Sequence, residues 1–125
     1  SGKLEFFREA KGLQLKNKSV GFADNKEGAH KLALKIIGKF NKVGEFKYSK
    51  VIIKSHKTKW GSCSKKGNLN FDYRLVFLPR RLAEYIVVHE LCHLKELSHN
   101  RKYWNLVEKT LPNYKNLIHE LKSNY

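Results

Sequence analysis

The sequence contains no methionine, two cysteines, two prolines and few acidic residues, and these scarcities exclude several classes of protein. Cys63 and Cys92 lie far apart and form no CxxC pair, which argues against a disulfide-rich scaffold or a zinc knuckle. No apolar run has the length of a membrane span or a secretion signal. We therefore predict a monomeric cytoplasmic protein with reduced thiols and no membrane contact. With methionine absent, Ser1-Gly2 is predicted to be a remnant of an expression tag.

Charge of one sign dominates the chain. Lysine and arginine total 26 against 11 aspartate and glutamate residues, which gives a formal net charge of +15. Such a field concentrates polyanions, so nucleic acid or nucleotides are candidate partners through a basic surface. The alternative is that the lysines are scattered over the surface and serve only solubility, because no nucleic-acid recognition motif accompanies them.

The length and composition favour one α+β domain over residues 1–125, since 125 residues with 41% hydrophobic content can bury a single core. Apolar residues at three- and four-residue spacing predict a helix that Gly44 ends, and β-branched runs predict two strands that pair as an antiparallel hairpin. The expected elements are short strands or loops over 3–26, a helix over 29–43, strands over 51–53 and 69–77, and helices over 79–97, from about 101, and over 114–122.

The residues His89-Glu90-Leu91-Cys92-His93 form an HExxH motif within the predicted helix over 79–97. Residues four apart lie on one helix face, so both imidazoles can reach one metal ion, while Glu90 projects beside them. Zinc suits this donor set and lowers the pKa of bound water to about 7, which would let Glu90 act as general base. The motif predicts one zinc ion per chain and a hydrolase.

A third ligand is needed to complete a catalytic zinc site, and His99 is the preferred candidate. It lies six residues beyond His93, where a polar turn can fold back before Ser98 or Asn100 caps the next helix. The competing ligand is Glu108 on that next helix, since glutamate also binds zinc. In a purely structural alternative, His89 and His93 are core residues hydrogen-bonded to backbone, although burying them with Glu90 requires a partner for each.

Several separated motifs together resemble the YgjP-like metallopeptidase family, also called the domain of unknown function 45, which is related to SprT-like zinc peptidases. The resemblance covers residues 29–125, and the residues that carry it are Trp60 to Ser64, Asn68 to Asn70, Leu75, Pro79, Tyr85 to Leu94, His99, Tyr103 and Trp104. Two positions depart from the usual pattern, with Asn100 in place of Ser after the third histidine and Tyr103 in place of Phe. The resemblance implies a minimal zincin fold, with a small sheet packed against the HExxH helix, ligands His89, His93 and His99, and catalytic Glu90.

Further residues are candidates for the lining of a substrate cleft. Gly61 permits close approach of backbone, and the small residues after it leave space beside the helix, although packing is an equal interpretation. Cys63 could also meet the metal as a thiolate, whereas Cys92 is interpreted as a packing residue. Arg80 and Arg81 could stabilise an oxyanion or could be solvated surface charges. The candidate lining residues are Trp60, Gly61, Ser62, Cys63, Asn70, Tyr73 and Arg74.

Four functions remain open at this point. A zinc metallopeptidase that cleaves a peptide or protein substrate ranks first by the resemblance. A metal-dependent hydrolase of nucleotides or phosphoanhydrides would suit the positive charge. A DNA-associated protease similar to the SprT-like relatives would use the basic surface to bind nucleic acid. A zinc-stabilised binding domain without catalysis is the fourth.

Overall fold

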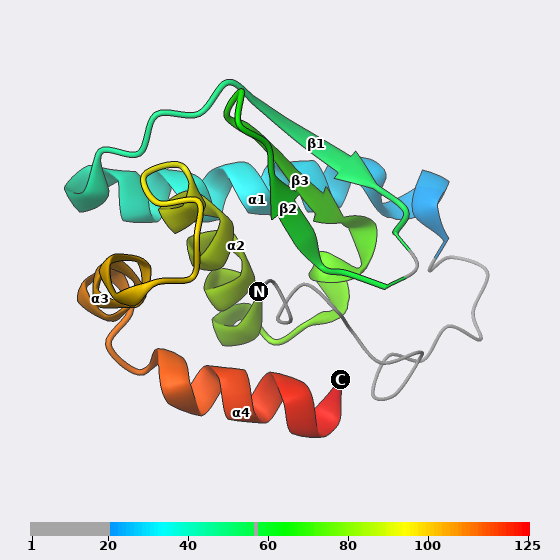
Figure 1. The fold of residues 1–125 in the computed structure, drawn as a ribbon. Coiled ribbons are helices and arrows are strands. Elements are labelled where there is room, and N and C mark those ends of the chain that lie inside the picture. Colours follow the sequence, from blue (N-terminus) through cyan, green and yellow to red (C-terminus); the bar gives the residue numbers. More distant parts are fainter. Residues whose placement is uncertain (1–20, 57) are drawn as a thin grey trace.

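The computed structural model describes residues 21–56 and 58–125, and within them the fold is α+β as predicted (Figure 1). The predictions for Ser1-Gly2 and for short strands or loops over 3–20 lie outside the described residues, whereas the strands or loops predicted up to residue 26 are wrong from residue 22, where α1 begins. No helix in the described residues has both the length and the apolar character that a membrane span requires. The elements are α1 (Phe22–Gly44), β1 (Lys50–Lys54), β2 (Gly61–Cys63), β3 (Asn68–Asp72), η3 (Tyr73–Phe77), α2 (Arg80–His93), α3 (Arg101–Thr110) and α4 (Tyr114–Asn124).

Helix α1 is amphipathic and begins seven residues before the predicted start at Ala29. Its buried stripe consists of two alanines and two isoleucines, and the alanines allow close packing because they have little side-chain volume. Gly44 is its last residue, as predicted, and Glu45 then turns the chain with a left-handed φ of 52°. The Lys95 ammonium donates to the Gly44 carbonyl at 2.6 Å and so satisfies one of the free acceptors at this helix end.

The sheet is mixed, which corrects the prediction of an antiparallel one. Strand order is β1-β3-β2, with β1 parallel to β3 and only β2 antiparallel to it. The antiparallel hairpin therefore consists of β2 and β3, whereas β1 pairs with β3 in parallel and is not part of the hairpin. The reason is the short strand β2, whose sequence Gly-Ser-Cys carries no β-branched signal. Because β2 reverses the chain between β1 and β3, those two strands run in the same direction.

The predicted strand over 69–77 ends early, at Asp72. The buried Asp72 carboxylate accepts a hydrogen bond from the Arg74 amide at 2.9 Å and caps the 3-10 helix η3, which takes up the remaining residues. The same carboxylate forms an ion pair with the Arg74 side chain at 3.0 Å. Asp72 thus redirects the chain from the sheet towards α2.

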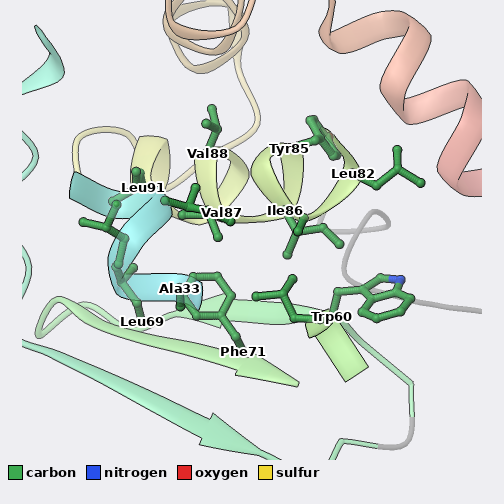
Figure 2. Close-up of a cluster of buried hydrophobic side chains, with 14 of the residues drawn as sticks. Ala33, Trp60, Leu69, Phe71, Leu82, Tyr85, Ile86, Val87, Val88 and Leu91 are labelled. Carbon is green, nitrogen blue, oxygen red and sulfur yellow. The ribbon is translucent and has the colours of Figure 1, made fainter. Parts of the chain in front are cut away.

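Helix α2 lies at the centre of the molecule, and most of its residues are buried (Figure 1). One side packs on the sheet, where Leu69 and Phe71 of β3 point towards Val87 and Ile86, and on α1 through Ala33 (Figure 2). Helices α3 and α4 pack against α2. A helix buried on all sides holds its side chains in fixed positions, which suits a site that needs defined geometry.

Candidate metal centre

Three histidine side chains converge at the end of α2. His89 and His93 occupy one face of that helix, and His99 folds back from the segment after it. The Nε2 atom of His99 lies 2.9 Å from His93 Nε2 and 3.3 Å from His89 Nε2. The structure therefore brings the three predicted metal ligands into one cluster.

The cluster has the dimensions of a metal site. Zinc–nitrogen bonds of about 2.0–2.1 Å in tetrahedral geometry place the ligand nitrogens about 3.3 Å from one another. The Nε2 separations of 2.9 and 3.3 Å are close to that value, and every donor is an imidazole nitrogen, which zinc accepts well. Three protein donors leave a fourth position open, as catalytic zinc sites require.

The end of α2 determines where His99 lies. The predicted helix over 79–97 ends at His93, and a final turn follows in which the amides of Lys95 and Glu96 both donate to the Cys92 carbonyl. This turn places the Glu96 carbonyl 3.0 Å from His93 Nδ1. Nδ1 must carry the proton to donate to that carbonyl, so the Nε2 lone pair is left facing the cluster. The early helix end thus orients one ligand and returns the chain to bring in another.

An aromatic pair at the start of α3 supports the histidines, and single-residue reasoning from the sequence did not assign it a role. The Tyr103 hydroxyl donates to the His89 carbonyl at 2.8 Å, and the Tyr103 ring stacks on His93 with centroids 4.4 Å apart. Trp104 stacks on His99 at 5.8 Å. Asn100 caps α3 by accepting from the Tyr103 amide at 2.9 Å, and this cap fixes the pair beside the cluster. The usable signal was an aromatic dipeptide four and five residues after His99.

Glu90 is buried beside the cluster without being one of its three members. Its Oε2 atom lies 3.1 Å from His89 Nδ1, and Oε1 has no hydrogen-bond partner among the described residues. Burial raises the pKa of the Glu90 carboxyl to about 8, although the electrostatic interactions with His93 and Lys59 oppose the rise. The buried Oε1 atom is therefore an acceptor that the described residues leave unsatisfied.

Strand β2 forms the wall next to Glu90. A Cβ on Gly61 would lie 3.2 Å from Glu90 Cγ and 3.0 Å from the Asn70 carbonyl oxygen, so glycine is needed for this close approach. Cys63 is two residues further along the strand and lies on the same face. Burial, followed by the charge of Glu90, raises the pKa of the Cys63 thiol to about 11, and Cys63 is not a member of the group that could hold a metal.

We expect the substitution Gly61→Ala to lower the free energy of unfolding by about 1–3 kcal/mol, because the added methyl group overpacks the contact with Glu90 and with the β3 backbone. Urea unfolding measures the change. Gly38→Ala is the matched control, since a Cβ at Gly38 meets nothing within 4 Å. If both variants had the same stability, the close packing of β2 on Glu90 would be disproved.

The other predicted lining residues lie elsewhere. Trp60 is buried in the core beneath α2 (Figure 2). Ser62 and Asn70 are cross-strand partners on the opposite face of the sheet from Gly61, and the Asn70 amide donates to Ser62 Oγ at 3.2 Å. Tyr73 packs edge-to-face on Phe22 of α1, at 5.8 Å between ring centroids.

The remaining charged and cysteine candidates are accounted for by other contacts. The Arg74 side chain donates to Asp72 and to the His56 carbonyl, which places it at the end of β3. Arg80 and Arg81 are surface residues that pair with glutamates of α2 and α4. Cys92 is fully buried, which agrees with its interpretation as a packing residue, and burial raises its pKa to about 12. The competing ligand Glu108 is exposed on α3 and is not part of the cluster.

We expect the metal-free protein to be most stable near pH 6.5, because its buried groups act in opposite directions. The pKa of Glu90 is raised to about 8, so the folded chain holds its proton more tightly and stability rises as the pH falls from 8. Burial lowers the pKa of His93 and lowers that of His99 to about 4, so the unfolded chain takes up more protons below pH 6.5. Below pH 6.5 the proton uptake of two histidines in the unfolded chain exceeds that of Glu90 in the folded chain, so the free energy of unfolding falls as the pH is lowered further.

Urea midpoints of chelator-treated protein from about pH 5 to about pH 8 measure this profile. In a Glu90→Gln variant the urea midpoint should no longer increase as the pH falls from 8 to 6.5, but it should still decrease below pH 6.5. A midpoint that increased steadily up to pH 8 would contradict the expected maximum.

Comparisons with known proteins agree with the geometry. A family model described as "YgjP-like, metallopeptidase domain" matches residues 7–124. The metallopeptidase zymogen abylysin of Pyrococcus abyssi has a similar structure, with a TM-score of 0.62 and 25% identity over 68% of this chain and 87% of that one. The zymogen of jannalysin from Methanocaldococcus jannaschii gives a TM-score of 0.55 and 25% identity over 72% of this chain and 88% of its own. No curated protein matches the chain.

Proposed function

Because the chain belongs to the YgjP-like metallopeptidase domain family, we propose that it is a zinc-dependent peptidase with Glu90 as its general base. The observation that carries the proposal is the convergence of three imidazole Nε2 atoms beside a buried carboxylate with one oxygen unpartnered among the described residues. We infer that His89, His93 and His99 hold one zinc ion per chain. The donor set, its spacing and the neutral state of the buried imidazoles all support zinc.

The histidines and Glu90 have different roles in the proposed peptide hydrolysis: the histidines hold the metal ion and Glu90 transfers the proton. Zinc, when bound, supplies Lewis acidity and lowers the pKa of a water molecule. Glu90 would accept a proton from the attacking water and would then donate it to the leaving nitrogen. In the metal-free chain burial raises the pKa of Glu90 to about 8, and the charge of a bound zinc ion would oppose that rise and favour the carboxylate form that accepts a proton.

A peptide or protein is the substrate class that the family favours, and cleavage within a chain is our proposal for the mode of attack. The two similar solved structures are both of metallopeptidases. Phosphoanhydride hydrolysis draws its support only from the net charge of +15, which is a property of the whole surface. The aromatic rings of Tyr103 and Trp104 that surround the histidines offer no comparable support for a phosphate.

Metal removal tests the proposal. Purified protein should contain about one zinc ion per chain, and chelation should abolish cleavage of unfolded casein, because the site then lacks its Lewis acid. Adding zinc back should restore both. Zinc measured by mass spectrometry together with a fluorescent casein assay gives the two readouts. A zinc content near zero in protein refolded with excess zinc would refute the metal site, whereas full zinc without cleavage would refute the peptidase activity.

A further inference from the structure

A stretch of the chain next to the metal centre is strongly basic. From Phe46 to Phe71 the sequence contains seven lysines and no aspartate or glutamate. This stretch includes the connection into β1, all of β1 and β2, and most of β3. The positive charge of the protein is therefore concentrated in the sheet and its turns. The net charge of this stretch is higher than an even distribution of the +15 along the chain would give it.

Four of these lysines lie together at one end of the sheet. The turn Ser64–Gly67 closes with a hydrogen bond from the Gly67 amide to the Ser64 carbonyl at 3.0 Å, and its two central residues are Lys65 and Lys66. Gly67 has a φ of 87°, which a glycine adopts without strain and which shapes the hairpin. Both lysines are exposed at the tip.

The connection into β1 adjoins this turn. The Ser49 amide donates to the Gly67 carbonyl at 2.8 Å, and Lys50 is the parallel partner of Asn68, so the two backbones are separated by about 4.8 Å. Figure 1 shows the start of β1 and the connection between β2 and β3 at the same end of the sheet. Lys47 and Lys50 are therefore neighbours of the turn lysines. Within the described residues none of the four forms an ion pair.

An exposed aromatic residue lies in the same segment as these charges. Tyr48 stands between Lys47 and Lys50 in sequence, 37% of it is exposed, and it is the aromatic member of the four exposed large hydrophobic residues in the described part of the chain. Lysines that follow a phosphate backbone, combined with an exposed ring on which a base can stack, are the two elements of single-strand recognition. A duplex or a lipid surface would use the lysines but offers no unstacked base for the ring.

We propose that Lys47, Tyr48, Lys50, Lys65 and Lys66, here called the lysine–tyrosine surface, bind single-stranded nucleic acid. The surface adjoins the metal centre, because a Cβ on Gly67 would lie 3.9 Å from the side chain of Leu94, the residue after His93. Nucleic acid bound there would lie next to the end of α2 that carries His93. The binding itself does not depend on the proposed peptidase activity.

The test measures fluorescence anisotropy of a labelled oligothymidylate with the full zinc-loaded chain over a range of salt concentrations. Replacing all four lysines by glutamine should weaken binding by about a hundredfold and reduce the steepness of its salt dependence. Tyr48→Ala should weaken binding by about tenfold, whereas Tyr48→Phe should bind as well as the original protein, because the ring and not the hydroxyl stacks on the base. The matched control replaces Lys31, Lys35, Lys115 and Lys122, on α1 and α4, and changes the net charge equally.

The results separate a local surface from general attraction. The proposal holds if the control variant binds within about twofold of the original protein while the surface variant does not. Equal losses in both variants would overturn it, because the whole charge of the protein would then be responsible. It would also be overturned if Tyr48→Ala bound normally, or if vesicles of anionic lipid or heparin competed for the surface as well as single strands. Circular dichroism of each variant establishes that it is folded.

Discussion

Replacing Glu90 by glutamine should lower the rate of casein cleavage by about a thousandfold while zinc remains bound at one ion per chain. Glutamine keeps the shape of the side chain in its packed position against Gly61, but an amide cannot accept a proton from water. The three imidazoles that surround the metal position are unchanged by the substitution. The two measurements are initial cleavage rate and zinc content of the same preparation.

This substitution also separates two roles for Glu90. Its Oε2 lies 3.1 Å from His89 Nδ1, so the carboxylate could act only by orienting that imidazole. The carbonyl of glutamine can accept the same hydrogen bond, and an orienting role would therefore survive the change with little loss of rate. Glu108→Gln on the exposed face of α3 is the control for loss of one negative charge and should cleave casein normally. Near-normal activity in Glu90→Gln would disprove the general-base role.

The parts of the site that lie on one helix could be predicted from the sequence. His89 and His93 occupy one helix face by spacing alone, and the structure places them there. Asn100 was a candidate cap for a helix starting near Arg101, and it is the residue that caps α3. Local spacing and capping chemistry operate within a few residues, so a single sequence contains the information.

The features that could not be predicted depend on pairing between distant segments. Strand β2 has three residues and no β-branched side chain, so nothing in its own sequence indicated that it pairs with β3. Because β2 was not predicted, the parallel pairing of β1 with β3 could not be predicted either. The stacking of Tyr103 on His93 and of Trp104 on His99 likewise joins α3 to α2 through tertiary packing. These contacts are non-local, and periodicity in one segment does not encode them.

Removing His99 should have the second large effect, on zinc affinity. His99→Ala removes one of three imidazole donors. Zinc should then bind about a thousandfold more weakly, since each ligand contributes several kcal/mol to the free energy of zinc binding. The original protein should gain about 10 °C or more in melting temperature when zinc is added at a thousand times its Kd, because the metal binds only the folded chain. His99→Ala should show almost none of this gain at the same zinc concentration.

Two further variants make this result specific to the third ligand. His119→Ala removes an exposed histidine of α4 and should keep the full zinc-dependent gain, which controls for histidine loss as such. Glu108→Ala tests the competing ligand directly, and it should also keep the gain, because Glu108 is exposed and outside the cluster. If Glu108→Ala lost the gain and His99→Ala kept it, the ligand set would be two histidines and a glutamate. The 2.9 Å approach of His99 Nε2 to His93 Nε2 argues for the opposite result, because two ring nitrogens at that distance need either a shared proton or a shared metal ion.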